Sequence, residues 1–177
     1  DEALAAVAAM LDADPLEALP RKPRLPTFWN PAVLPRPRVR GGDLVLSLEH
    51  LEVVAAVLSM TDLQEPYAGV EVLEQTLEPE SLADFAWALF EQWLHTGADS
   101  KEGWALAALG LVGNDRIAGM LTPMIRRWPG ESQHRRAVTG LDVLLSIGTD
   151  VALMHLNGIA QKVKFKGIKK NARERID

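Results

Sequence analysis

Positively charged side chains gather near the carboxyl-terminal end of the sequence, where they could bind phosphate groups. Residues 162–177 contain seven lysines and arginines against two acids, a net charge of +5. Bases three and four residues apart lie on neighbouring faces of a helix, and such a cluster can displace the counterions of a nucleic acid. The candidate contacts with phosphate or a partner are Lys162, Lys164, Lys166, Lys169, Lys170 and Arg173. A solvated helix face is the alternative interpretation.

A short polar stripe precedes this cluster. His155, Asn157 and Gln161 lie among apolar neighbours, and Asn157 and Gln161 are one helical turn apart. These three side chains could line a concave binding groove. A histidine that is hydrogen-bonded within the core is the more ordinary interpretation of His155.

The usual signatures of catalysis are missing from the sequence. There is no glycine-rich phosphate loop, no GxSxG, no HExxH and no cysteine, and the four histidines lack the spacing of metal ligands. We therefore expect no catalytic residue, no metal and no cofactor, and a protein that is not an enzyme. A hydrolase or glycosylase that uses a groove carboxylate remains a third hypothesis, and it requires a buried Asp or Glu in a concave pocket.

The sequence repeats at a spacing of 35 residues, and this repeat predicts the helices that position the candidate side chains. The segment 111–117 falls on 146–152, so that glycine meets glycine and aspartate meets aspartate, and Trp93 falls on Trp128. Self-similarity at this period indicates stacked helix pairs. We predict an all-α, right-handed α-solenoid of HEAT-like helix pairs. A TPR array is the rival by period, but its signature fails after Trp104, where Ala107 and Ala108 replace the required Leu and Gly.

Capping signals mark the boundaries of the predicted helices. Asn114 and Thr149 are good N-caps, because their side-chain oxygens can accept an amide of the next helix. Gly113 and Gly148 are expected to close the preceding helices in the left-handed conformation. Pro123 predicts a kink or a late start in the helix that contains it.

Apolar residues recur at helical spacing between these boundaries and predict the core. They are Leu106, Leu109 and Val112 in one helix, Val138, Leu141 and Leu145 in another, and Ile117, Leu121, Met124, Ile125 and Trp128 in a partner. The aromatic residues assigned to the core are Phe85, Phe90, Trp93, Trp104 and Trp128.

Three segments organise the chain, which we expect to be one domain and a fragment of a longer protein. Residues 1–19 predict an N-terminal helix, 20–46 a proline-rich basic arm packed on the helices, and 47–177 the helical repeats. Six prolines between positions 20 and 37 exclude a helix from the arm. The apolar side chains expected to hold the arm in place are Phe28, Trp29, Leu34 and Val39. Ser47 should cap a helix through Met60.

Charge is strongly segregated along the sequence, although the net charge is only -5. Residues 21–42 hold six bases and no acid, whereas residues 43–100 hold twelve acids and no base. Such asymmetry can mark a surface for nucleic acid or a partner, or the basic segments can lie against the acidic middle. No apolar run approaches a membrane span and no signal peptide opens the sequence, so we expect a cytoplasmic protein.

Several longer runs resemble a known family. They are Glu65–Tyr67, Phe85–Phe90, Ser100–Leu106, Trp128–Ser132 and Ile147–Gly167. Together they resemble a large bacterial family with a domain of unknown function, often joined to a WGR domain, whose members are described as regulators of molybdate metabolism. The resemblance implies that the chain is the helical-repeat part of such a protein. It supplies no catalytic residues, and it favours nucleic acid slightly, because WGR domains elsewhere are linked with nucleic-acid sensing.

These observations favour a non-catalytic scaffold that binds other domains of its own full-length chain or another protein. The alternative is a nucleic-acid-binding domain that uses the basic arm and the basic C-terminal helix. It predicts binding that weakens steeply with salt and is sensitive to charge reversal at Lys166, Lys169 and Lys170. Neither hypothesis involves a membrane, and both leave the oligomeric state open.

Overall fold

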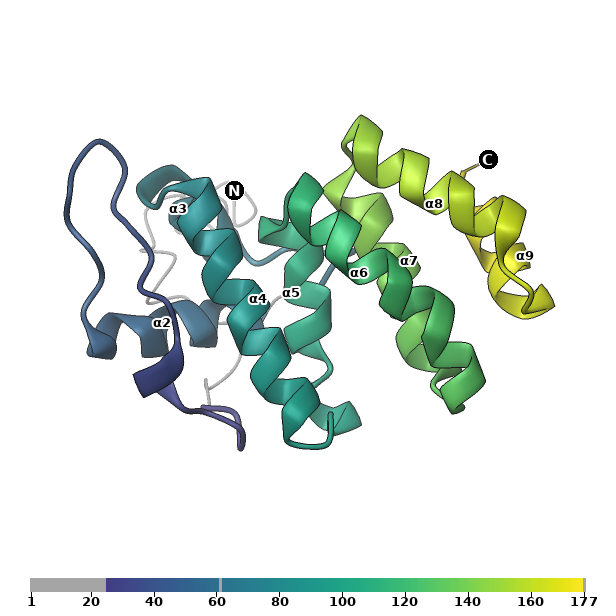
Figure 1. The fold of residues 1–177 in the computed structure, drawn as a ribbon. Coiled ribbons are helices and arrows are strands. Elements are labelled where there is room, and N and C mark those ends of the chain that lie inside the picture. Colours follow the sequence, from purple (N-terminus) through teal and green to yellow (C-terminus); the bar gives the residue numbers. More distant parts are fainter. Residues whose placement is uncertain (1–24, 61, 177) are drawn as a thin grey trace, which may run out of the picture.

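The computed structural model describes residues 25–60 and 62–176, and these residues form helices joined by loops with two isolated backbone bridges. The all-α class is therefore confirmed for this part of the chain. The α-helices, labelled in Figure 1, are α2 (Leu48–Ser59), α3 (Ala68–Thr76), α4 (Pro79–His95), α5 (Trp104–Val112), α6 (Asp115–Arg127), α7 (His134–Ile147), α8 (Asp150–Lys162) and α9 (Lys166–Glu174). Three short 3-10 helices are η1 (Pro31–Val33), η2 (Ser100–Glu102) and η3 (Trp128–Glu131). The helix predicted over residues 1–19 lies outside the described residues.

Two consecutive helix pairs share one register. α6 begins at Asp115 and ends at Arg127, and α8 begins and ends at the predicted offset, at Asp150 and Lys162. α5 packs against α7 and α6 packs against α8, so the equivalent helices of the two pairs are neighbours. Figure 1 shows the chain progressing from α2, α3 and α4 at one end to α8 and α9 at the other. The earlier helices are arranged differently, since α4 packs mainly on α5 and α2 contacts both α3 and α5.

Local capping explains where several helices begin. The side-chain oxygen of Asn114 accepts a hydrogen bond from the amide of Ile117 at 3.1 Å, and that of Thr149 accepts one from Ala152 at 3.2 Å. Ser47 caps α2 in the same way. The predicted N-caps are confirmed, because each satisfies an amide that the helix itself leaves unpaired.

The structure tests the predictions about two glycines and one proline. Gly148 adopts the left-handed conformation with φ 65°, as predicted, but Gly113 is extended with φ -77°. The chain leaves α5 through two extended residues, Gly113 and the N-cap Asn114, and this path needs no left-handed residue. For Pro123 the late start is excluded, because the Asn114 cap fixes the start of α6 at Asp115 and Pro123 lies inside the helix, whereas the kink stays a prediction.

Apolar packing joins the helices through one cluster of buried side chains. Phe85, Phe90, Trp93 and Trp128 are buried as predicted, and Trp104 is partly buried against the cluster. The predicted stripes are also buried, with Met124 and Val138 at the margin. Leu145 is the exception, since its side chain is 41% exposed. α7 instead turns Leu141, Val143 and Leu144 toward the core, and this leaves Leu145 on the solvent side.

The arm crosses α4 from its carboxyl-terminal end to its amino-terminal end. Thr27 donates two hydrogen bonds of 2.6 Å to Glu102, and Asn30 exchanges hydrogen bonds of 3.2 and 2.8 Å with Gln92. Further along, the backbone of Arg38 bonds to the start of α4, and the amide of Arg40 donates to the Thr76 carbonyl at 2.8 Å. Two of the four apolar residues expected to hold the arm, Phe28 and Leu34, are buried, whereas Trp29 and Val39 are partly buried.

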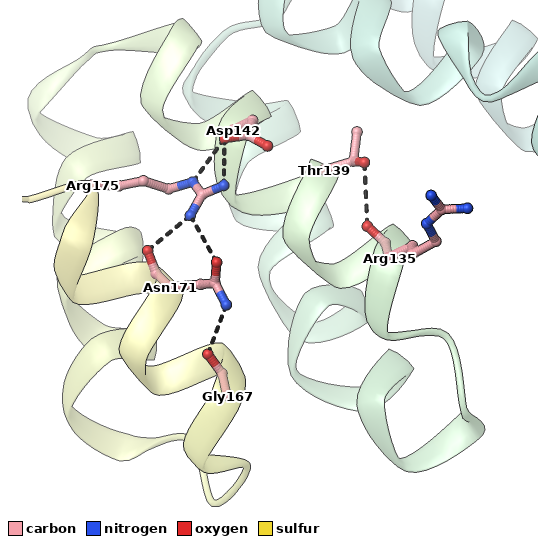
Figure 2. A network of polar contacts seen from close by, with 6 residues as sticks. All are labelled: Arg135, Thr139, Asp142, Gly167, Asn171 and Arg175. Atoms are coloured by element: carbon pink, nitrogen blue, oxygen red, sulfur yellow. Dashed lines mark hydrogen bonds and ion pairs between the residues drawn. The ribbon is translucent and has the colours of Figure 1, made fainter.

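A polar network docks α9 on α7 (Figure 2). The guanidinium of Arg175 donates to one carboxylate oxygen of Asp142 at 2.7 and 2.6 Å, and it also bonds to the carbonyl of Asn171 at 2.9 Å. The two charged side chains are 17% and 31% exposed. Ile168 and Ala172 are buried beneath the same helix. This docking fixes the position of the basic residues in and before α9.

Replacing Arg175 with methionine should loosen α9 without unfolding the rest of the chain. Hydrogen bonds between charged groups that are partly shielded from water contribute about 1.5–3 kcal/mol, so amide exchange in α9 should accelerate by about tenfold or more. Hydrogen exchange followed by mass spectrometry measures this directly. Lys170→Met is the matched control, because it removes the exposed Lys170–Glu174 pair, whose N–O distance is 3.6 Å. Equal exchange in both variants would contradict a docking role for Arg175.

Candidate functional site

The basic residues near the C-terminus do not form one continuous strip. Lys162 ends α8, Lys164 lies in the linker, and Lys166 begins α9. Lys169 instead donates a 2.9 Å hydrogen bond to the carbonyl of Gln161 and so joins α9 to the end of α8. In addition, Lys170 pairs with Glu174, while Arg173 is exposed at the end of α9. The six predicted contacts therefore differ in whether their side chains already bond within the protein, and so in their availability to a ligand.

Two of these lysines meet an arginine that we did not predict. Arg126, near the end of α6, lines a hollow of about 220 Å³ together with Lys162, Lys164 and Phe165. Among the described residues, none of the three cations has a side-chain hydrogen bond or an ion pair. Phe165 is 37% exposed and makes an edge contact with the ring of His134, with the ring centroids 6.5 Å apart. We call this group the basic hollow.

The predicted polar stripe on α8 has two different environments. Gln161 donates a 3.1 Å hydrogen bond to Asn157, and both side chains are exposed. His155 is half-buried and lies beside Gly119 of α6, with its Nε2 atom 3.9 Å from the position of a Cβ at that glycine. A groove that combines the three side chains stays a prediction.

A larger pocket of about 430 Å³ lies between the η2–α5 segment and the first turns of α7. Its lining combines apolar side chains with two arginines and several hydroxyl or amide groups: Trp93, Ala98, Ser100, Gly103, Leu106, Gln133, Arg135, Arg136 and Thr139. We call it the Arg136 pocket. Its volume falls within the range of about 300–1,000 Å³ that is usual for small-molecule sites.

Arg136 is held between two tryptophans that occupy equivalent positions in the sequence repeat. The guanidinium carbon is 5.1 Å from the ring centroid of Trp93 and 5.8 Å from that of Trp128. Burial lowers the pKa of Arg136, and the negative charge of Glu131 raises it in partial compensation. Glu131 itself forms an ion pair of 2.8 Å with Arg127. No described carboxylate forms an ion pair with Arg136, so the pocket contains a cation that is positioned but unpaired.

Sequence reasoning missed this pocket. The signal that could have indicated it is the run His134-Arg135-Arg136 at the start of a helix, where acids rather than bases are favourable. The repeat had already aligned Trp93 with Trp128, but it did not show that one arginine contacts both rings.

A carboxylate enzyme would need a buried acid. Among the residues that the structure describes, the buried polar residues are Ser59 and Thr122, and neither is an acid. Glu74 lines two pockets, and partial burial and the charge of Glu71 raise its pKa while Arg40 lowers it, but the residue as a whole is exposed. Within residues 25–60 and 62–176, no cluster of three His, Asp or Glu could hold a metal ion, and no helix is long and apolar enough to cross a bilayer.

Comparison with known proteins gives one relative of this chain. No family model matches the sequence, and no solved structure matches it. The "Uncharacterized protein YehI" of Escherichia coli (strain K12) is 36% identical over 170 residues, which is 96% of this chain. The chain is similar to a segment of YehI. That segment is only 14% of the length of YehI, so the similarity concerns one part of a much longer protein.

The name of YehI indicates no function, so the similarity assigns none to this chain. The similarity agrees with the expected resemblance to bacterial proteins of unknown function. It shows neither a WGR domain nor a link with molybdate, and these remain hypotheses that rest on the sequence runs alone.

Proposed function

We propose that this chain is a non-catalytic, HEAT-like helical-repeat domain that binds other segments of a longer protein or a separate protein partner. The observation that carries the proposal is the shared register of the pairs α5–α6 and α7–α8, in which α5 packs on α7 and α6 on α8. Repeats that contact mainly their neighbours form extended surfaces suited to binding other chains. A right-handed solenoid and a cytoplasmic location are parts of this proposal.

The length of YehI supports a partner within the same full-length chain. Because the matching segment is 14% of the length of YehI, most of that protein lies outside it and is the source of candidate internal partners. A role in molybdate regulation is the finer hypothesis that the resemblance adds.

The matching segment of YehI and the remainder of YehI, expressed separately, test the interaction proposal. We expect the two parts to associate with a stoichiometry of one to one in analytical ultracentrifugation, and the present chain to compete for the remainder. No association at about 100 μM, corresponding to a binding free energy weaker than about 5.5 kcal/mol, would reject an internal partner. Crosslinking in cells that express tagged YehI would then test a separate protein.

Nucleic-acid binding is the second candidate function, and the basic hollow favours it. Arg126, Lys162 and Lys164 line one depression beside an exposed aromatic ring, and none of the three cations has an ion pair among the described residues. Phosphates release counterions on contact with such groups, and an aromatic ring can stack on a base.

Removing the three charges of the basic hollow should weaken nucleic-acid binding and flatten its salt dependence. Replacement of Arg126, Lys162 and Lys164 with glutamine should reduce the slope of log affinity against log salt by about one per lost phosphate contact. Fluorescence anisotropy with labelled single-stranded and duplex DNA and RNA measures the slope. The matched control replaces the exposed residues Lys101, Arg116 and Arg127 with glutamine, which removes the same charge away from the predicted contacts. Equal slopes in the two triple variants would reject the hollow as the contact, and flat anisotropy at low salt would reject nucleic-acid binding.

A further inference from the structure

We propose that the Arg136 pocket binds a small organic carboxylate whose apolar body lies against Trp93 and Leu106. This proposal does not depend on the scaffold function proposed above, and either proposal can fail without the other. The inference rests on the pocket itself, on the fixed arginine within it and on the fact that no described carboxylate forms an ion pair with that arginine. Glu131, whose charge acts on Arg136, is ion-paired with Arg127.

The pocket is electropositive because of both side chains and backbone. Arg135 and Arg136 line it, and neither side chain has an ion pair among the described residues. They belong to the first turn of α7, which contains no acid and has no side-chain cap at Gln133. The positive end of the helix adds to the two charges. An anion in the pocket would therefore meet two arginines and the positive end of a helix.

The fixed plane of Arg136 favours a carboxylate. Contacts with Trp93 and Trp128 restrict the guanidinium, so less conformational entropy is lost when it pairs with a ligand. A guanidinium matches the two oxygens of a carboxylate through parallel hydrogen bonds. Arg135 is exposed at the same rim and can supply a further donor.

The other side chains that line the pocket indicate a ligand with a small apolar body. Trp93, Ala98 and Leu106 present carbon surface, whereas Ser100, Gln133 and Thr139 supply polar groups. A volume of about 430 Å³ accommodates a small molecule or the end of a peptide. A free carboxylic acid and a peptide C-terminus share the same recognition chemistry here.

Titration with matched probes tests the proposal. In nitrogen-15 NMR, phenylacetate should shift the indole signal of Trp93, whose N–H donates to the Asp99 carbonyl at 2.9 Å, with a dissociation constant of about 1 mM. Phenylacetamide, which has the same shape without the charge, should bind about tenfold more weakly. A hexapeptide ending in phenylalanine, with a free or an amidated C-terminus, distinguishes a chain end from a free acid. Phenyl phosphate distinguishes a phosphate site.

Two variants test whether phenylacetate binding depends on Arg136. Arg136→Met keeps an unbranched side chain between the two tryptophans but should weaken phenylacetate binding by about tenfold. Arg126→Met, in the basic hollow, should leave it unchanged. The dispersion of the NMR spectrum shows whether each variant is folded, and if Arg136→Met does not fold, Arg136→Gln replaces it.

Each outcome of these titrations either supports or overturns the proposal. Saturable binding of either carboxylate source that depends on Arg136 supports the proposal. No saturable shift with phenylacetate or the free-acid peptide at about ten times the expected dissociation constant overturns it. Equal binding of the acid and the amide would also overturn it, and tighter binding of phenyl phosphate would overturn the assignment to a carboxylate.

Discussion

Replacement of Trp128 with alanine should lower the free energy of unfolding by about 3–5 kcal/mol. The ring is 1% exposed, and its edge packs closely on α7, 3.2 Å from the position that a Cβ at Gly140 would occupy, so its removal would leave a buried cavity. It also supports the guanidinium of Arg136, so the Arg136 pocket should lose its shape. Urea denaturation followed by circular dichroism measures the loss.

Trp29→Ala is the control for this prediction. Trp29 belongs to the arm and is only partly buried against the core, so its removal should cost clearly less. If Trp128→Ala were no more destabilising than Trp29→Ala, the packing at the junction of α6 and α7 could not be the close contact described above.

Replacement of Gly140 with alanine should destabilise the fold by about 1–3 kcal/mol, although alanine is the better helix former. A Cβ at this position would lie 2.5 Å from Cγ1 of Ile125, which is fully buried and belongs to α6. The two helices approach closely because residue 140 has no side chain. Chemical denaturation measures the change in stability.

Gly119→Ala is the matched control, since Gly119 also lies inside a helix. The nearest atom to a Cβ there is Nε2 of His155 at 3.9 Å, an ordinary contact. This variant should gain about 0.5–1 kcal/mol from the better helix propensity of alanine. A gain at both positions would contradict the close approach of α6 and α7 at Gly140.

Local sequence signals predicted the parts of the fold that depend on neighbouring residues. The N-caps Asn114 and Thr149 are set by hydrogen bonds that span three residues, and so they could be recognised from spacing alone. Gly113 was mistaken for a copy of Gly148, because aligned residues need not share a conformation when the connections between helices differ.

The candidate sites were harder to predict because they depend on packing. Lys162 and Lys164 were recognised by their charge, whereas Arg126 joins them only because α6 packs on α8. The Arg136 pocket needs residues from α4, α5 and α7 together. The charge distribution and the 35-residue period indicated which segments could bind a ligand. They did not show which cations would have no ion pair among the described residues.

The course of the arm along α4 determines how this end of the molecule would respond to mechanical force. As the arm runs from Thr27 to Arg40, its partners run backward from Glu102 to Thr76. A pull applied at residue 25, away from α4, would reach these attachments in succession instead of loading them together. The arm would therefore peel away at low force, starting from the two hydrogen bonds of Thr27, while the helix pairs behind it stay folded.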